Sequence, residues 1–155
     1  MKRIFLGTPI TSILHNDNKD ECEKDLKSIR SIFNSLNDME HIEAVCALDR
    51  EEWGKNPMKG EVCTELDYLE MKRCDVYVTF PIKSHGVSVE LGWGSSLKKK
   101  IIILINTEHQ FLTPLYFGLF KLTDTKIIEY KSYTNFPSMN DWRERILPEI
   151  LSFID

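Results

Sequence analysis

The stretch DVYVTFPIKSHGVSVELGWGSSLKKKIIILI (Asp75–Ile105) combines three patterns that together decide the fold. The apolar runs DVYVTF and KIIILI predict two buried strands, and VSVELGWGSSLKK between them predicts a helix. Neighbouring parallel strands need such a crossover, and strands covered on both faces read as apolar runs. This stretch therefore predicts a strand–helix–strand unit of a parallel sheet.

The same alternation continues along the chain. Strands and helices are predicted in turn at 3–7, 21–36, 42–48, 61–75, 126–130 and 140–154. Helical spacing in 61–75 and 140–154 predicts that these side chains face the core: Val62, Leu66, Leu69, Met71, Trp142, Ile146, Ile150 and Phe153. No repeat or linker divides the segments. We therefore expect one α/β domain over residues 1–155, with a five-stranded parallel sheet between two layers of helices.

The composition of the 155 residues narrows the class of protein and its partners. A net charge of −4 argues against a nucleic-acid partner, and no apolar run is long enough to span a membrane. The chain enters a strand directly rather than a signal peptide, so we expect a cytoplasmic protein with a small-molecule partner. The four cysteines contain no Cys-x-x-Cys pair, and the four histidines have no paired spacing. No metal or other cofactor is expected.

Two turns at the carboxyl ends of the predicted strands are the first places to look for a ligand. In open α/β sheets ligands bind at this edge, where the strand order reverses. The turn after the first strand contains Gly7 and Thr8, and Ser84, His85 and Gly86 lead into the helix after the third strand. The free N–H groups of a helix start attract anions, and Ser88 adds a hydroxyl. The alternative is that Ser84 only caps the helix.

Glu90 is an unusual residue so near the start of a helix that packs on a sheet. Gly86 and Glu90 are separated by about 6 Å of helix rise, roughly the span from the 5′-phosphate of a nucleotide to the anomeric carbon of its ribose. A carboxylate there could attack that carbon and expel the base. We expect the helix dipole to keep Glu90 ionised. The alternative is a solvated glutamate in the first turn.

These residues resemble the nucleoside 2-deoxyribosyltransferase superfamily, which includes deoxyribosyltransferases and nucleoside 5′-monophosphate N-glycosidases. The resemblance runs through RIFLGTP, DYLEMKRCDVYVTF and SHGVSVELGWGSSLKKKIIIL, and its most specific part is Ser-x-Gly-Val-x-x-Glu-Leu-Gly, from Ser84 to Gly92. It implies a flavodoxin-like (Rossmann-like) three-layer sandwich. It also implies that Glu90 is the nucleophile and that Asp67 positions the sugar or protonates the leaving base. A solvated helix carboxylate is the alternative for Asp67.

The residue six before the glutamate separates two branches of this superfamily. Transferases that act on free nucleosides resemble one another in carrying Asp there, whereas the monophosphate glycosidases carry Ser. This chain has Ser84, and a serine accepts a phosphate that an aspartate would repel. The resemblance thus implies hydrolysis of a nucleoside 5′-monophosphate. Base exchange by a deoxyribosyltransferase and a nucleotide- or NAD-sensing module without turnover are the alternatives. The glycine-rich first loop of some glycosidases is replaced here by GTPITS.

Two further segments have open interpretations. The polar segment 49–61 contains Trp53, which is expected to pack on the domain or, alternatively, to stack on a base as part of a lid. The aromatic segment His109–Phe120 is expected to lie in the core, with a subunit interface or a wall for the base as alternatives. Several members of the superfamily complete their site with a neighbouring subunit. We accordingly expect a homodimer or a higher homo-oligomer.

Overall fold

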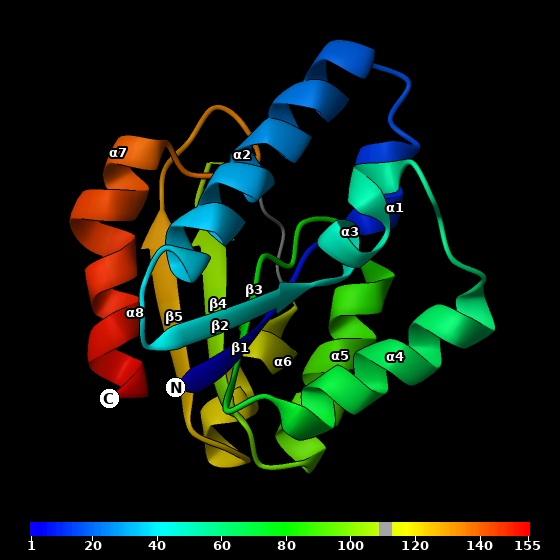
Figure 1. Ribbon diagram of the computed structural model, residues 1–155. Coiled ribbons are helices and arrows are strands. Elements are labelled where there is room, and N and C mark those ends of the chain that lie inside the picture. Colours follow the sequence, from blue (N-terminus) through cyan, green and yellow to red (C-terminus); the bar gives the residue numbers. More distant parts are fainter. Residues whose placement is uncertain (109–112) are drawn as a thin grey trace.

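Five parallel strands form the centre of the computed structural model, which describes residues 1–108 and 113–155 (Figure 1). The strands are β1 (Lys2–Gly7), β2 (Ile42–Cys46), β3 (Val76–Thr79), β4 (Lys100–Asn106) and β5 (Thr125–Tyr130). Their order is β2-β1-β3-β4-β5, and every neighbouring pair is parallel. The order reverses between β1 and β3, as in flavodoxin-like sheets. The predicted fold class is confirmed.

Helices cover both faces of this sheet (Figure 1). They are α1 (Ile10–Leu14), α2 (Lys19–Asn37), α3 (Ala47–Arg50), α4 (Gly60–Arg73), α5 (His85–Ser96), α6 (Pro114–Gly118), α7 (Met139–Asp141) and α8 (Leu147–Ile154). Short 3₁₀ turns at Glu52–Gly54 and Leu119–Lys121 and a π turn at Trp142–Ile146 complete the described elements.

Alternating side chains along the strands build the two cores. Ile4, Leu6, Val76 and Val78 belong to the cluster that α2 and α8 cover. Side chains at intervening positions, such as Tyr77, point to the other face and pack with residues of α4 and α5. Tyr77 is 0% exposed. The strand period therefore sets its ring on the face of the sheet that carries α5.

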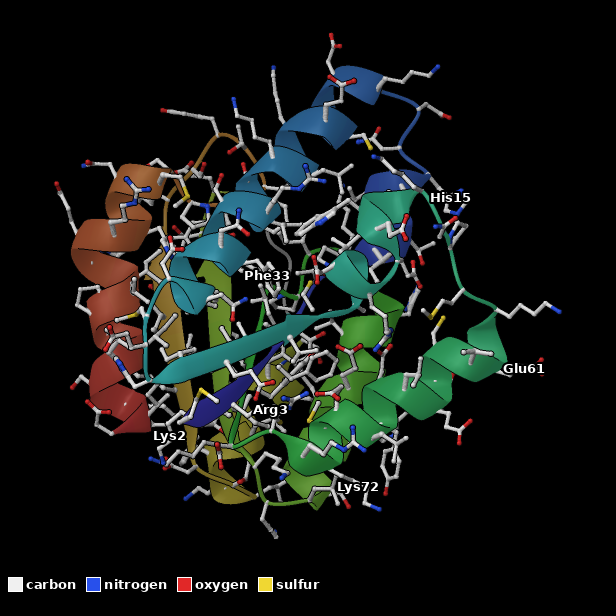
Figure 2. All side chains as sticks on the ribbon, viewed as in Figure 1. Lys2, Arg3, His15, Phe33, Glu61 and Lys72 are labelled. Atoms are coloured by element: carbon white, nitrogen blue, oxygen red, sulfur yellow. The ribbon has the colours of Figure 1, made fainter. Side chains whose placement is uncertain are left out.

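The segment boundaries differ from the predicted ones in two instructive places. The predicted strand 42–48 ends at Cys46, and its last two residues begin α3. In α4 the prediction that Val62 faces the core is wrong, because Val62 is 43% exposed and Glu70 is buried beside Met71. At the two ends of this helix Glu61 and Lys72 lie at the exposed surface (Figure 2).

The carboxyl-terminal stripe is confirmed except at its end. Trp142, Ile146 and Ile150 are each 0% exposed, but Ile154 rather than Phe153 completes the buried row. The π turn of Trp142–Ile146 directly precedes α8, where Pro148 stands in the first turn. Proline is tolerated in a first helical turn, where its missing N–H group leaves no intrahelical bond unmade.

The two segments with open interpretations have different outcomes. The indole ring of Trp53 packs 5.9 Å from the ring of Phe33 on α2, and the guanidinium of Arg30 lies 4.6 Å from its centroid. Trp53 therefore packs on the domain, as expected. In the aromatic segment residues 109–112 lie outside the described residues, and the core interpretation is wrong for its exposed apolar members, Leu115, Phe117 and Phe120.

Membrane insertion finds no support in the described helices. Within residues 1–108 and 113–155, no helix combines the length and the apolar character that a membrane span requires.

Candidate active site

The switch point between β1 and β3 places the predicted turns beside one another. Gly7 pairs with Thr79 in the parallel ladder, and the hydroxyl of Thr79 donates to the carbonyl of Gly7 at 3.0 Å. Thr8 is 8% exposed, and its hydroxyl lies 3.8 Å from the Cys46 thiol, within hydrogen-bonding range of sulfur. Gly7 and Thr8 thus form the floor of this edge and join β1 to both of its neighbours.

The start of α5 is built as a capped helix. The Ser84 hydroxyl accepts a hydrogen bond from the Val87 backbone N–H at 3.2 Å, so Ser84 is the N-cap. The Ser88 hydroxyl donates to the Ser84 carbonyl at 3.2 Å and lies 2.7 Å from the Tyr116 hydroxyl. His85 and Gly86 are exposed. The first turn therefore presents backbone N–H groups to solvent on the side of Gly86.

Glu90 lies in the second turn of α5 and turns its carboxyl group inward. The Tyr77 hydroxyl donates a hydrogen bond to Glu90 Oε2. Space for this ring comes from Gly7, because a Cβ added there would lie 2.6 Å from Cζ and Cε2 of Tyr77. Gly7, Tyr77 and Glu90 thus form one unit that links β1, β3 and α5. Glu90 is not the solvated glutamate of the alternative interpretation.

Burial decides the charge of Glu90 in the free protein. Desolvation raises the pKa of Glu90 to about 8, although the hydrogen bond from Tyr77 and the positive charge of Arg50 oppose this shift. The prediction that the helix dipole keeps Glu90 ionised is therefore wrong. The helix begins at His85, so Glu90 stands beyond the first turn, where the dipole acts most strongly. The phenol of Tyr77 remains protonated, since burial and Glu90 both raise its pKa.

Asp67 reaches the same region from α4. Arg50 Nη2 donates to Asp67 Oδ1 at 2.6 Å, and this ion pair is largely shielded from solvent, with 19% and 13% of the two side chains exposed. Burial raises the pKa of Asp67, and the hydrogen bond from Arg50 works against that rise. The negative charge of Asp67 raises the pKa of Glu90, so the two predicted carboxyl groups are electrostatically coupled.

Two members of this cluster, Tyr77 and Arg50, were not among the predicted site residues. Tyr77 stands in the apolar run DVYVTF, where the alternation of the strand cannot distinguish a core tyrosine from one that serves a carboxylate. Arg50 ends α3, directly beyond the carboxyl end of β2. The rule that ligands bind at this edge would have made it a candidate. Among the described residues, the buried Nε of Arg50 has no hydrogen-bond partner.

The predicted residues fall on two sides of α5. Gly86 and Glu90 are four residues apart and so lie on one face of the helix, where the Glu90 carboxyl group contacts Tyr77. Ser84, His85 and Ser88 line a cavity of about 1020 Å³ on the opposite side, and neither Glu90 nor Asp67 is among its lining residues. The turn from Ser84 to Gly86 therefore lies between this cavity and the face of α5 that carries Glu90.

Comparisons with known proteins identify relatives of this arrangement. No protein-family model matches the chain, and no curated protein matches it by sequence. Among solved structures, the CMP N-glycosidase BcmB of Clostridium botulinum is similar, with 28% identity and a TM-score of 0.61 over 84% of this chain and 91% of that chain. BlsM, solved in solution, has 25% identity and a TM-score of 0.74 over 99% and 92% of the two chains.

A third structure extends the comparison of folds. A 2-deoxyribosyltransferase from Bacillus psychrosaccharolyticus shares 14% identity and a TM-score of 0.56, and the match covers 92% of this chain and 90% of that one. At this identity the likeness concerns the fold alone. The first two matches confirm the resemblance to the nucleoside 2-deoxyribosyltransferase superfamily, on the side of its nucleotide N-glycosidases, and the third agrees with them in fold.

Proposed function

We propose, from this likeness to nucleotide N-glycosidases, that the protein hydrolyses the N-glycosidic bond of a nucleoside 5′-monophosphate. The similar enzyme BcmB is a CMP N-glycosidase, so cytidine 5′-monophosphate is the first substrate to test. The observation that carries the proposal is the enclosed Glu90 carboxyl group, which accepts a hydrogen bond from Tyr77 and lies near Asp67 and Arg50. Strongly raised pKa values at the carboxyl edge of an α/β sheet are typical of functional sites.

The chemistry follows from the place of Glu90 on α5. The carboxylate of Glu90 attacks C1′ of the sugar, the C1′–N bond breaks, and the base leaves with a proton. Water then attacks C1′ of the glycosyl ester and gives a proton to the group that protonated the base, the ester bond breaks to restore the Glu90 carboxylate, and the sugar 5-phosphate is released. Because the nucleophile must first lose its own proton, we expect the ionisation of Glu90 to make kcat/KM rise with pH up to about 8.

Asp67 has the properties of the assisting acid. Burial raises the pKa of Asp67 and so favours its protonated form, the ion pair with Arg50 favours the charged form, and the leaving base needs a proton. Arg50 holds this side chain in place at 2.6 Å. In our proposal Asp67 donates to the base or holds the sugar, while Tyr77 and Arg50 act through the two carboxyl groups rather than on the substrate.

The start of α5 is suited to the phosphate group. Ser84 adds no negative charge, and the N–H groups of the first turn lie at the positive end of the helix dipole. Gly86 exposes this backbone on the face of Glu90, because it carries no side chain. In our proposal Ser84, Gly86 and Ser88 hold the phosphate, with His85 at its rim.

The direct experiment follows release of the base from nucleosides and their 5′-monophosphates by chromatography. Cytidine 5′-monophosphate is expected to be cleaved by the wild-type protein and not by Glu90→Ala. An added second base tests for exchange, which would identify a transferase instead. Equal base release by wild type and Glu90→Ala would refute the proposed nucleophile, and tight binding without any base release would favour a sensing module.

Replacing Ser84 tests the substrate class separately. Asp and Asn both cap helices well, so Ser84→Asp and Ser84→Asn preserve the start of α5. Only the aspartate repels a phosphate. We expect Ser84→Asp to raise KM for the monophosphate about tenfold or more relative to Ser84→Asn, as loss of one charge-assisted contact would. An equal KM for the two variants would exclude a phosphate at this turn.

A further inference from the structure

The cavity on the far side of α5 is not accounted for by a nucleoside monophosphate. It lies over the carboxyl ends of β3 and β4, and residues from α2, α5 and the segment after β5 line it. Ser88 faces this cavity, while Glu90, two residues on, points about 200° away around the helix. A nucleotide whose sugar reaches Glu90 therefore approaches the cavity with its phosphate end only.

The size of the cavity exceeds what a phosphate needs. Its volume is about 1020 Å³, at the upper end of the roughly 300–1,000 Å³ that is usual for whole small-molecule sites. A terminal phosphate on the Ser84–Gly86 turn would occupy a small part of this space. The remainder begins where the 5′-phosphate ends, so it can receive a group that is attached to that phosphate.

The rim of the cavity carries two lysines, with the carboxylate of Glu21 also among its lining residues. Lys24 of α2 and Lys83 before α5 both line it and are exposed. Among residues 1–108 and 113–155, neither lysine has an ion-pair partner. Lys83 also has a φ of 43°, a left-handed conformation that is uncommon for a residue with a side chain. Ammonium groups next to a phosphate-binding turn suit a second phosphate.

The floor of the cavity is polar and enclosed. Asp25 of α2 is 5% exposed and accepts a hydrogen bond from Asn135 Nδ2 at 2.8 Å. Asn135 in turn accepts from the hydroxyl of Tyr130 through its backbone carbonyl, at 2.6 Å. These contacts fix a carboxyl group at the cavity wall, which is a typical partner for hydroxyl groups of a ligand.

We infer that the cavity binds the outer part of a nucleoside 5′-diphosphate, with its β-phosphate near Lys24 and Lys83 and a hydroxylated group esterified to it near Asp25. This inference rests on the proposed N-glycosidase function and extends its substrate class from monophosphates to diphosphates and diphosphate esters. The reaction itself is unchanged. The C1′–N bond breaks, water supplies the new oxygen on C1′, and the diphosphate linkage leaves intact on the sugar.

The experiment compares base release from cytidine 5′-monophosphate, cytidine 5′-diphosphate and a cytidine diphosphate hexose. We expect kcat/KM for the diphosphate to exceed that for the monophosphate about threefold or more, in line with one added charge contact at an exposed site. The hexose ester is expected to be cleaved at least as well as the diphosphate. A diphosphate that reacts no faster than the monophosphate overturns the inference and leaves the proposed function standing.

Two variants and one control test whether the preference for the diphosphate and its ester arises in the cavity. Lys24→Ala is expected to remove the advantage of the diphosphate and to leave the monophosphate unchanged, whereas Lys27→Ala, also exposed on α2 but not lining the cavity, should alter neither. Asp25→Asn should lower activity on the hexose ester relative to the diphosphate. If Lys24→Ala changes both substrates equally, or neither, the cavity does not bind the second phosphate.

Binding measurements distinguish a failure of this inference from a failure of the proposed function. Dissociation constants of the three nucleotides are measured by calorimetry on Glu90→Gln, with and without Lys24→Ala. Tighter binding of the diphosphate that depends on Lys24 would support the diphosphate site in the cavity. It would do so even if the wild-type protein released no base from any nucleotide, and that lack of base release would refute the N-glycosidase. Equal dissociation constants for the monophosphate and the diphosphate would refute the inference that the cavity binds a second phosphate and would leave the proposed N-glycosidase function standing.

Discussion

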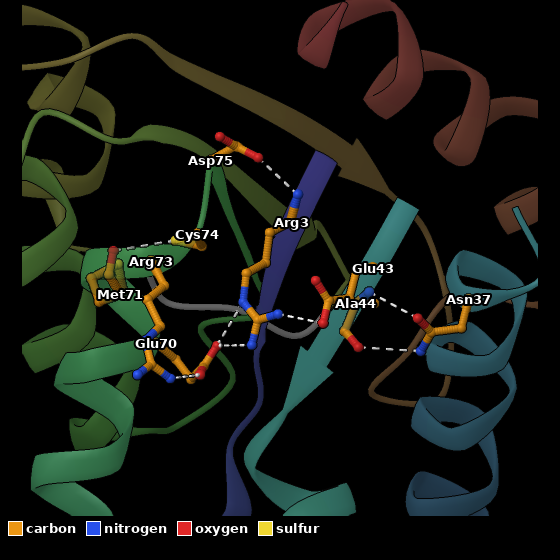
Figure 3. A network of polar contacts seen from close by, with 9 residues as sticks. All are labelled: Arg3, Asn37, Glu43, Ala44, Glu70, Met71, Arg73, Cys74 and Asp75. Carbon is orange, nitrogen blue, oxygen red and sulfur yellow. Dashed lines mark hydrogen bonds and ion pairs between the residues drawn. The ribbon is translucent and has the colours of Figure 1, made fainter. Parts of the chain in front are cut away.

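Two carboxylates of α4, one turn apart, serve opposite ends of the sheet in different ways. Glu70 accepts two hydrogen bonds from Arg3 at the start of β1, at 3.1 and 2.8 Å (Figure 3). Arg3 also pairs with Glu43 of β2, and its backbone N–H donates to Asp75 at 2.8 Å. Asp67, one turn earlier, accepts a hydrogen bond from Arg50 at 2.6 Å.

The difference concerns which charge state each environment favours. At the amino end the ion pairs with Glu43 and Glu70 raise the pKa of Arg3 and so stabilise its charged form. At the carboxyl end burial raises the pKa values of Asp67 and Glu90 and so disfavours their charged forms. In our proposal the contacts at the amino end stabilise the fold, whereas the carboxyl groups at the other end take part in the reaction.

Among the partners of Glu90, the largest expected effect on activity comes from Tyr77→Phe. Phenylalanine keeps the ring beside Gly7 but removes the donor to Glu90. A hydrogen bond to a charged group contributes about 1.5–3 kcal/mol, so base release at neutral pH should fall roughly 10- to 100-fold. The rise of kcat/KM with pH should also move to higher pH, because this bond lowers the pKa of Glu90. An unchanged pH profile would show that the hydrogen bond from Tyr77 does not affect the pKa of Glu90.

The partners of Glu90 should shift the same profile in opposite directions. Arg50→Met removes a positive charge that lowers the pKa of Glu90, so the midpoint should move up. Asp67→Asn removes a negative charge that raises it, so the midpoint should move down. Arg3→Met at the other end of the sheet is the matched control and should leave the midpoint in place. Shifts of equal sign for the first two variants would contradict the assigned electrostatics.

Glu90 should also make stability depend on pH. Its pKa is 4.5 in the unfolded reference and about 8 in the folded protein, so the folded state holds the proton more tightly. This contribution to stability is fully present below pH 4.5 and decreases by at most about 1.4 kcal/mol per pH unit as pH rises toward 8. Urea unfolding at several pH values should show a shallower decrease for Glu90→Gln. An unchanged slope would mean that Glu90 is solvated.

The smallest expected change in activity accompanies Arg3→Met, which should affect stability instead. Removing the guanidinium leaves Glu70, whose side chain is 11% exposed, without Arg3 as its partner. The free energy of unfolding should fall by about 1.5–3 kcal/mol, which urea unfolding would measure. Activity of the remaining folded protein should stay near that of wild type. A large loss of activity in folded Arg3→Met would mean that the two ends of the sheet are coupled.

Most of the fold could be predicted because its signals are local. The apolar runs and crossover helices gave all five strands to within two residues at each end. Val62 was misplaced because α4 buries Glu70 through an ion pair with Arg3, a contact that hydrophobic spacing cannot indicate. The exposed residues of α6 were predicted to lie in the core because their apolar and aromatic composition is typical of buried residues. Composition alone does not show whether such side chains pack inside the domain.

The candidate site was predictable only in part. Ser84, Gly86 and Glu90 lie on consecutive turns of one helix, so their spacing was informative. Arg50 and Tyr77 come from α3 and β3, and only the folded sheet brings them to Glu90. The charge of Glu90 was mistaken for the same reason. Its burial depends on Tyr77 and Gly7, which neighbour it in space and not in sequence.

The most direct test of Glu90 as nucleophile is to trap the glycosyl ester. A 2′-fluoro arabinosyl analogue of cytidine 5′-monophosphate should form the ester and hydrolyse slowly, because fluorine destabilises both positively charged transition states. We predict an increase in intact mass equal to one fluorinated sugar phosphate less one water, mapped by peptide sequencing to Glu90 and absent from Glu90→Gln. Release of the base without this adduct, or an adduct on Asp67, would contradict the account.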